Sequence, residues 1–400
     1  MSAAAPASAA VTAPDPVLAA MDRLQAWLDT AELRGYEPFD GLSSRLRPLA
    51  RTSYSRRMLV QLFKRSRVNL RPLLGVPRCH STKAMGYLAR ACLRRYRAAE
   101  GPAWLQRAAD LLRWLTDHAS AGYHGPCWGN SFDYETRLFY LPAGAPTVVW
   151  SALIGQAFVD AFELTGESRY LDVARGICEF FLRDIPLQAA PAGACFSYVT
   201  FTPVQVHNAN CLVAGLLARV YRHGAEPVLA ERAAQALEFT AAAQHPDGGW
   251  DYGPAPNLRW IDNWHTGYVL DSFLDFEQST GDARFQATMR RGWDFYWNHF
   301  FTPDALARHY WRQTYPIDIQ CVAQSIETLC RFAHWEPDAV GRARQVALVA
   351  LAQMQDPSGY FYFQRGRYWV NRTPYLHWGQ ATMMCALAGL RLALRGEHAL

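Results

Sequence analysis

The sequence predicts an all-α fold, an (α/α)6 toroid in which helical hairpins close into a ring. Apolar residues recur with helical periodicity along almost the whole 400-residue chain, and strand-like alternation is confined to 195–201 and 359–363. Strongly apolar helices alternate with amphipathic ones, and the apolar helices recur about every 53 to 59 residues. The apolar helices would form a buried inner ring, and the amphipathic helices a half-exposed outer ring. Counting the earlier helices gives about six hairpins.

The individual helices follow from the same periodicity. The first part of the chain is predicted to hold helices at 16–30, 53–67, 81–97 and 103–118. Apolar inner helices are predicted to begin near Thr147, Val206, Ile261, Ile317 and Tyr375. Their amphipathic partners are predicted at 169–183, 227–244, 283–300 and 337–355. Short turns such as LTGES and STGD join the helices of a hairpin, and the loops DGGWDYG and PSGYFYF lie two hairpins apart.

The N-terminal residues 1–15 are rich in Ala, Pro and Ser and contain no basic residue. We expect a disordered lead there and a single toroid domain over 16–400. A signal peptide needs a charged start and a leucine-rich stretch. This segment has neither, so a cytoplasmic location is predicted. We found no apolar run long enough to cross a bilayer.

The nine cysteines are scattered, and no CxxC motif occurs. Most lie in apolar helical segments, which predicts buried, reduced thiols. Cys79, His80 and Cys127 could suggest a zinc site like that of lanthionine cyclases, but their spacing and order do not fit one. We therefore predict no metal and no cofactor.

The net charge of +5 is distributed unevenly along the chain. The stretch 41–99 holds no Asp or Glu, and about fifteen Arg and Lys. Lys64 and Lys83 are the only lysines of the whole chain. The segment could form a solvated helix face, attract an acidic polymer, or give peripheral contact with an anionic membrane through residues 45–78. No nucleic-acid-binding motif accompanies the charge.

Polar residues recur in the first turns of the predicted inner helices and in the loops before them. In a closed ring of hairpins all inner helices run the same way, so these residues should meet at one mouth. The stretch 245–271, HPDGGWDYGPAPNLRWIDNWHTGYVLD, is the strongest example, with Asp262 or Asn263 as the helix cap. Aromatic faces beside Asp, Asn and His side chains are suited to binding sugar rings. The predicted substrate-binding residues are Trp128, Glu135, Asn208, Trp250, Tyr252, Arg259, His377 and Gln380.

Two kinds of chemistry fit the candidates. Glycoside hydrolysis needs two carboxyl groups, and Asp262 with Asp133 is the preferred pair, with Asp318 in reserve. Lyase or epimerase chemistry needs a base beside a sugar C–H, a role that suits His207 and His265. A uronic or N-acyl sugar could then be held by Arg137, Arg259 or Arg372.

Several motifs carry a resemblance to known proteins. GYEPFDGL, CWGNSFDYETRLFYLPAGAPT, VHNAN, DGGWDYG, WIDNWHTGYVLD and YPIDIQ resemble motifs of bacterial exopolysaccharide-biosynthesis proteins within the six-hairpin glycosidase-like superfamily. This resemblance implies the toroid and a role in polysaccharide metabolism, but no established catalytic residues. The DGGW loop also resembles repeats of terpene cyclases and prenyltransferase β-subunits, whose DxDD, DDxxD and zinc-ligand motifs the chain lacks.

The sequence therefore predicts a carbohydrate-active enzyme whose partner is a neutral or acidic oligosaccharide or polysaccharide bound at the toroid mouth. A glycoside hydrolase or polysaccharide lyase is favoured. The alternatives are a sugar epimerase of the N-acylglucosamine 2-epimerase type and a non-catalytic glycan-binding component of exopolysaccharide assembly.

Overall fold

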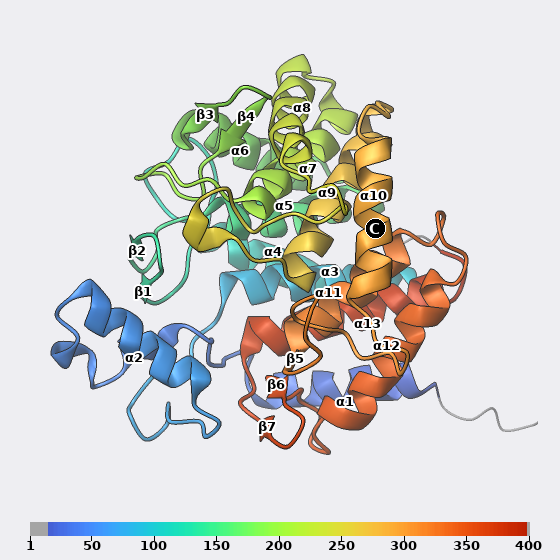
Figure 1. The fold of residues 1–400 in the computed structure, drawn as a ribbon. Helices are drawn as coiled ribbons and strands as arrows, with labels where there is room; N and C mark the ends of the chain where they lie inside the picture. Colours follow the sequence, from blue (N-terminus) through green and yellow to red (C-terminus); the bar gives the residue numbers. More distant parts are fainter. Residues whose placement is uncertain (1–14, 398–400) are drawn as a thin grey trace, which may run out of the picture.

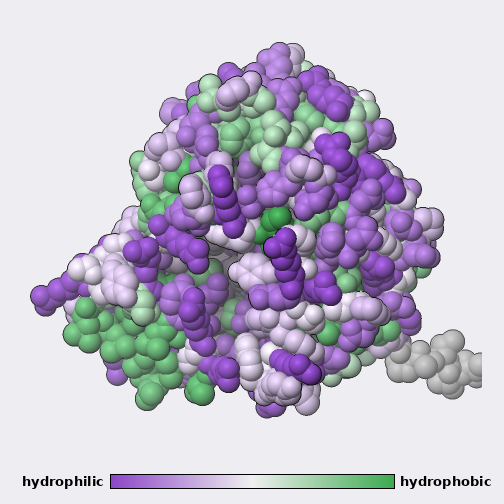
Figure 2. Space-filling model, in the orientation of Figure 1, coloured by the Kyte–Doolittle hydropathy of each residue, from purple (hydrophilic) through white to green (hydrophobic). Residues whose placement is uncertain are grey.

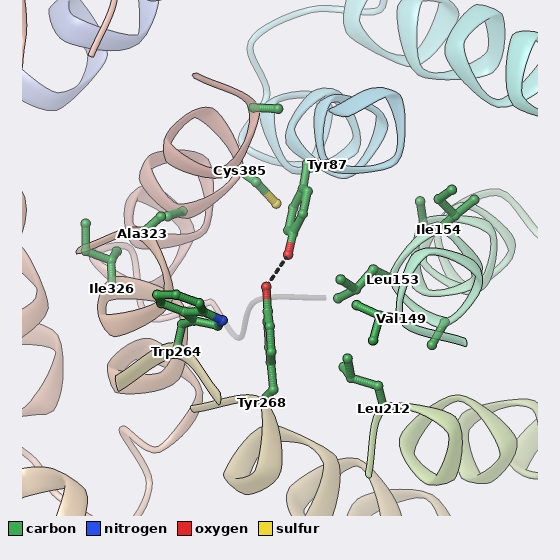
Figure 3. Packing of buried hydrophobic residues seen from close by; sticks show 14 of the residues in the cluster. Tyr87, Val149, Leu153, Ile154, Leu212, Trp264, Tyr268, Ala323, Ile326 and Cys385 are labelled. Atoms are coloured by element: carbon green, nitrogen blue, oxygen red, sulfur yellow. Dashed lines mark hydrogen bonds between the residues drawn. The ribbon is translucent and has the colours of Figure 1, made fainter. Parts of the chain in front are cut away.

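The predicted ring of helical hairpins is present in the computed structural model, which describes residues 15–397 (Figure 1). Each inner helix contacts the next, and the last contacts the first, so the ring is closed. Figure 3 shows inner helices arranged around a common centre. The inner helices are α3 (Thr82–Arg97), α5 (Val148–Thr165), α7 (His207–Gly224), α9 (Asn263–Thr280), α11 (Ile319–Arg331) and α13 (Thr382–Ala393). The (α/α)6 fold prediction is confirmed.

The outer helices cover this ring. Each of α3, α5, α7, α9 and α11 packs against the helix that follows it in the chain. The sixth hairpin joins the two ends of the described chain, because α1 packs beside α13. The outer helices are α1 (Pro16–Thr30), α4 (Ala103–Asp117), α6 (Ser168–Asp184), α8 (Pro227–Ala242), α10 (Gln286–His299) and α12 (Ala339–Met354). The predicted lead at 1–15 lies, apart from Asp15, outside the described residues.

Short strands occur in the loops that connect the helices. The strands are β1 (Tyr134–Glu135), β2 (Tyr140–Leu141), β3 (Leu187–Ala189), β4 (Ala194–Phe196), β5 (Ile317–Asp318), β6 (Gln364–Arg365) and β7 (Val370–Asn371). The predicted strand at 195–201 therefore overlaps β4 only at its start. The strand-like stretch at 359–363 lies in a loop and contributes one bridge, between Phe361 and Gln355, just before β6 begins at Gln364.

Side-chain caps set where inner helices begin. The Thr147 hydroxyl accepts the Trp150 amide at 3.2 Å, and the Asp318 carboxylate accepts the Gln320 amide at 2.9 Å. These bonds satisfy amides that have no partner within the helix. At the other end, Gly166 and Gly281 stop α5 and α9 with φ of 73° and 72°, a left-handed conformation that glycine adopts easily. The turn motifs LTGES and STGD therefore act as predicted.

The centre of the ring is closed by a tyrosine pair from opposite sides. The hydroxyls of Tyr87 on α3 and Tyr268 on α9 lie 2.8 Å apart (Figure 3). Tyr268 also accepts a hydrogen bond from the Gln320 side chain at 3.1 Å. Buried hydroxyls need such partners, and this contact forms a polar floor across an otherwise apolar interior.

A belt of buried charges links the inner helices near their C-terminal ends. Helices that begin at residues 82, 148, 207, 263 and 319 each carry a charge twelve residues later. These charges are Arg94, Asp160, Arg219, Asp275 and Arg331, whose signs alternate around the ring. The ion pairs between inner helices are Arg90–Asp160 at 2.6 Å, Arg219–Asp160 at 2.7 Å, Arg331–Asp275 at 2.5 Å and Arg94–Glu327 at 2.9 Å.

Helix α5 is long and apolar enough to cross a membrane by length and composition, contrary to our expectation for the chain. In the structure 78% of its apolar window is buried inside the protein. Its hydrophobic surface is therefore used by the ring, as expected for an inner helix.

Residues 40–78 form an arm beside the ring, and α2 (Ser53–Arg65) is its helix (Figure 1). The arm has a small core of its own, made of Leu42, Ala50, Leu59, Val60, Phe63 and Val76. The Arg71 guanidinium donates to Asp40 within the arm at 2.6 Å, and to the carbonyl of Glu37, outside the arm, at 2.9 Å. The same guanidinium stacks over Tyr375 at 4.7 Å. These contacts hold α2 over one end of the toroid.

Asp160→Ala tests the charge belt. The substitution would leave Arg90 and Arg219 buried without their shared carboxylate, so we expect a loss of about 3–5 kcal/mol in the free energy of unfolding. Urea denaturation followed by circular dichroism measures this loss. Asp172→Ala removes an exposed ion pair on α6 and should cost less than about 1 kcal/mol. Equal losses in the two variants would contradict a structural role for the belt.

Candidate functional site

A large cavity opens where the inner helices begin. Its volume is about 870 Å³, a size suited to a small ligand or a short oligosaccharide. First-turn residues of several inner helices line it, among them Lys83, Val149, Trp150, Asn208, Trp264 and His265. One face of α2 and the β1–β2 loop complete the wall. The predicted convergence of inner-helix first turns at one mouth is therefore confirmed, and Figure 2 shows the surface hollowed beside the arm.

Aromatic rings form much of the cavity wall. Tyr252 and Trp260 stack with ring centroids 4.5 Å apart, and Trp264 meets Trp378 edge-on at 5.1 Å. Phe39 extends this surface, with its centroid 5.6 Å from that of Trp378. Flat aromatic faces of this kind give a sugar ring an apolar surface to lie on.

Asp262 and His265 form a hydrogen-bonded pair at the start of α9. One Asp262 oxygen caps the helix by accepting the His265 amide at 3.1 Å. The other oxygen lies 2.7 Å from His265 Nδ1 and also accepts the Trp260 indole N–H at 2.9 Å. One carboxylate therefore starts the helix and orients the imidazole.

The pair leaves one imidazole nitrogen free for chemistry. Burial raises the pKa of Asp262, but the adjacent His265 ring outweighs burial and holds that pKa below its ordinary value. An ionised carboxylate accepts a hydrogen bond from the proton on Nδ1 of His265, and in the neutral form of the ring the lone pair is then on Nε2. Among the described residues Nε2 has no hydrogen-bond partner, and the side chain lines the cavity. This geometry is that of a general base.

His309 is a second cavity histidine that sequence reasoning missed. Its ring centroid lies 5.0 Å from that of Trp264, and the Trp264 ring lies 4.6 Å from that of His265. Burial lowers the pKa of His309, and its buried Nδ1 has no hydrogen-bond partner among residues 15–397. His309 lies in an irregular loop and not in a helix with periodic apolar residues, so no sequence pattern indicated it.

Glu135 and Asp262 are the described carboxylates that line the cavity. Glu135 accepts hydrogen bonds from Arg56 at 2.6 Å and Ser53 at 2.8 Å. Burial raises the pKa of Asp40 to about 6 and that of Asp271 to about 7, but neither residue lines the cavity. The two described carboxylates of the wall are therefore each bound to a basic side chain, Glu135 to Arg56 and Asp262 to His265.

Two predicted catalytic carboxylates do not reach the cavity lining. Asp133 is engaged by Arg47 at 2.5 Å and by the Ala143 amide at 2.9 Å. Asp318 accepts the Gln320 amide, the Trp378 indole at 3.0 Å and the Gln364 side chain at 2.7 Å. Both carboxylates are occupied by loop and cap contacts, and the structure does not bring Asp133 to Asp262 as a hydrolytic pair.

Two predicted histidines are also placed behind the wall. His207 is 3% exposed, and burial, aided by the charge of His245, lowers its pKa to about 4. His377 pairs with Glu37, and burial lowers the pKa of His377 although the Glu37 charge opposes this. Their neighbouring residues Asn208 and Trp378 line the cavity instead, because adjacent residues of a helix face different directions.

The remaining predicted substrate-binding residues divide between wall and core. Asn208, Tyr252 and Glu135 line the cavity, and the buried Asn208 Oδ1 has no hydrogen-bond partner in the described chain. The other four do not line it. Trp128 and Trp250 are core rings whose N–H groups donate to carbonyls, Gln380 fixes the Phe361 backbone, and Arg259 lies exposed.

All nine cysteines are free, and eight of them are buried. Within residues 15–397 no three His, Cys, Asp or Glu side chains are placed to hold a metal ion.

No protein-family model and no curated protein matches the sequence. Several solved structures match the fold. A D-mannose isomerase has a TM-score of 0.63 at 10% identity, covering 98% of this chain and all (100%) of its own. A cellobiose 2-epimerase from Bacillus thermoamylovorans has 0.58 at 13%, covering 79% of this chain and 88% of its own. A glycoside hydrolase family 76 mannosidase from Bacteroides thetaiotaomicron has 0.63 at 10%, covering 94% and 99%. This likeness shows the toroid fold.

The reassignment of His207 can be tested by the pH dependence of stability. Its folded pKa of about 4 lies below the unfolded value of about 6.5. The neutral ring therefore contributes stability above pH 6.5 that is lost as the pH falls towards 4, roughly 3 kcal/mol in total. His207→Gln should remove this part of the pH dependence in urea titrations between pH 7 and 4. His118→Gln, on the surface, should leave it unchanged, and an unchanged slope in His207→Gln would contradict the assignment.

Proposed function

We propose that this protein is a saccharide-converting enzyme that transfers a proton at a sugar carbon next to a carbonyl group. The observation that carries the proposal is the Asp262–His265 pair, whose free Nε2 belongs to a cavity wall of stacked aromatic rings. Epimerisation and aldose–ketose isomerisation both begin with this proton transfer. The toroid shared with an isomerase and an epimerase is consistent with it.

The residues support a two-histidine mechanism. His265 Nε2 takes the proton from the carbon next to the carbonyl, and Asp262 stabilises the imidazolium that forms. The electron pair of the broken C–H bond forms a carbon–carbon double bond, and the π electrons of the carbonyl move to its oxygen. The product of this step is an enediolate. His309, neutral because burial lowers its pKa, is the second group able to take or deliver a proton. Return of a proton to the opposite face of the same carbon restores the carbonyl and gives an epimer. Return to the neighbouring carbon, with the hydroxyl proton transferred to the former carbonyl oxygen, gives an isomer.

Polysaccharide lyase chemistry is the second candidate. Its first step is also removal of a proton next to a carbonyl group, that of a uronate carboxylate, and the next step expels the 4-linked oxygen. The cationic side chains of the cavity favour this candidate because they could neutralise the carboxylate. The motif resemblance to exopolysaccharide-biosynthesis proteins supports saccharide units of a bacterial polysaccharide as the substrate in either case.

Glycoside hydrolysis receives less support. Both cavity carboxylates are engaged, Glu135 by Arg56 and Asp262 by His265, and the lowered pKa of Asp262 keeps that group ionised. A non-catalytic glycan-binding role is also less favoured, since binding alone would not require an imidazole oriented by a buried carboxylate.

Proton transfer can be detected directly in deuterated water. Wild type is incubated with reducing mono- and disaccharides and with uronate oligosaccharides, and deuterium at the sugar carbon is followed by NMR and mass spectrometry. His265→Gln and Asp262→Asn should lower the exchange rate by about a hundredfold or more. Asp172→Asn, on the outer surface of α6, should leave it unchanged.

Other outcomes identify the alternatives. Cleavage without deuterium incorporation, lost in Asp133→Asn, would support the carboxylate-pair hydrolase and overturn the proposal. An unsaturated product would identify a lyase. Saccharide binding by wild type with neither exchange nor cleavage would support the glycan-binding component.

A further inference from the structure

Both lysines of the chain line the cavity. The sequence holds 40 Lys and Arg residues, and all except Lys64 and Lys83 are arginines. Lys64 comes from α2 in the arm, and Lys83 comes from the first turn of α3. Two segments with no other lysine therefore each direct an ammonium group to the same wall.

Lys83 is a buried cation without a hydrogen-bond acceptor. The residue is 6% exposed, and among the described residues its ammonium makes no hydrogen bond and no ion pair. The ammonium lies 5.0 Å from the Trp150 ring centroid, which compensates only part of the cost of burial. The charge of the Glu37 carboxylate raises the pKa of Lys83, but Glu37 is itself paired with His377.

Lys64 lies between aromatic rings of the mouth. Its ammonium is 4.6 Å from the Phe39 centroid and 5.7 Å from that of Trp378. Trp378 in turn contacts Trp264, the neighbour of His265. A charged group of a bound sugar could therefore contact Lys64 while the sugar ring lies near the imidazole.

The charge of the wall is strongly positive. Arg57, Arg65 and Arg137 line the cavity together with the two lysines, and none of the five has an ion-pair partner in the described structure. The two carboxylates of the wall are already engaged by Arg56 and His265. An excess of unpaired cations inside a concave, partly desolvated site attracts and retains anions.

We propose that Lys83 is a subsite for an anionic group of the saccharide, a carboxylate or a phosphate, and that Lys64 supplies a second positive charge at another place on the same wall, so that the substrates are acidic saccharides. The inference rests on the proposed function only in taking the cavity as the saccharide site. The pH dependence adds to the geometry: burial lowers the pKa of Lys83 to about 8, so its charge is lost in mildly alkaline solution.

The scarcity of lysine makes the subsite directly observable. An amine-acylating reagent can label only Lys64, Lys83 and the chain's N-terminal amine, and mass spectrometry of the peptides quantifies each. Glucuronate oligosaccharides or glucose 6-phosphate should protect Lys83 but not the N-terminal amine, and the oligosaccharides, which carry several carboxylates, should protect Lys64 as well, whereas glucose should protect neither lysine. The two acidic probes distinguish a carboxylate from a phosphate as the bound group. Equal protection by glucose and by the acidic probes would overturn the subsite.

Variants separate charge from packing. Lys83→Met should lower the affinity for the acidic probe by about ten- to a hundredfold and leave that for glucose unchanged. Lys83→Arg should keep the affinity and remove its decline above pH 8, because guanidinium stays charged. Lys64→Met, at the less buried position, repeats the test if Lys83→Met does not fold. Wild-type affinity for the acidic probe in both Met variants would contradict the proposal.

This result is independent of turnover. Protection by acidic probes without deuterium exchange on any saccharide would leave the subsite standing and overturn the proposed reaction. Exchange on neutral sugars without protection by acidic ones would do the reverse.

A second surface is carried by different residues of the arm. Leu49, Leu62, Val68 and Leu73 are 78%, 49%, 70% and 77% exposed. Figure 2 shows an apolar area over the arm at the lower left. Arg45, Arg51 and Arg67 are exposed on the same segment and have no carboxylate partner among the described residues, and no Asp or Glu occurs from 41 to 99.

We infer that this arm surface docks on an anionic lipid bilayer. Exposed leucines can enter the interface while arginines contact lipid phosphates, and the acid-free segment offers no repulsion. A neutral protein partner would not require that charge pattern.

Co-sedimentation with lipid vesicles tests the docking. Full-length protein should bind vesicles that contain phosphatidylglycerol, bind phosphatidylcholine alone weakly, and dissociate at high salt. The double substitution Leu49→Ser, Leu73→Ser should reduce binding at least about tenfold. Val228→Ser, 39% exposed on the outer helix α8, is the control. The inference is wrong if the protein does not bind vesicles. It is also wrong if the protein forms a dimer that the double substitution disrupts and shows no lipid binding.

Discussion

The ring depends on the alternating charge belt at the C-terminal ends of its inner helices. A buried ion pair is stable only when its geometry is close to ideal, because desolvation otherwise exceeds the Coulombic attraction. Asp160 satisfies Arg90 and Arg219 at once, so α5 must lie at one depth and one rotation relative to α3 and α7. In five of the six inner helices the charge lies twelve residues after the helix start, roughly 18 Å along the helix axis. Fixing one end of the helices at this depth also fixes their first turns at the other end, where the cavity lies.

The sequence predicted the fold well, because the fold is set by a local and repeated signal. Apolar periodicity, caps and glycine stops lie within a few residues of the helix ends they determine, and α9 begins two residues after the predicted start near Ile261. The charge belt carried the same kind of signal, a charge at one phase of successive apolar helices, and could have been found by aligning the repeats. The contact of α1 with α13 could not, since nothing local to either helix specifies it.

The candidate site was predicted only in part. Asp262 and His265 were found because cap and base lie within one turn of each other. His309 lies in an irregular loop. Lys64 lies on the arm, which contacts the ring through Arg71, whose guanidinium donates to the Glu37 carbonyl and stacks over Tyr375. Asp318, His207 and His377 occupy the expected first turns but are satisfied by neighbours or face behind the wall. Helical phase places a residue near the mouth, whereas its neighbours from distant hairpins decide which way it faces and what it binds.

The difference between a cap and a functional group therefore lies in what remains unpaired. The Asp318 carboxylate accepts three hydrogen bonds and has little capacity for a ligand. His265 Nε2, Asn208 Oδ1 and the Lys83 ammonium belong to residues of the cavity wall, and none has a hydrogen-bond partner in the described structure. A folded protein rarely leaves buried polar atoms unpaired without a ligand or a reaction to compensate them. These groups surround aromatic faces: a free base, an amide oxygen and a buried cation. They match a ligand that has an acidic hydrogen, hydroxyl donors and a negative charge. An acidic sugar has all three.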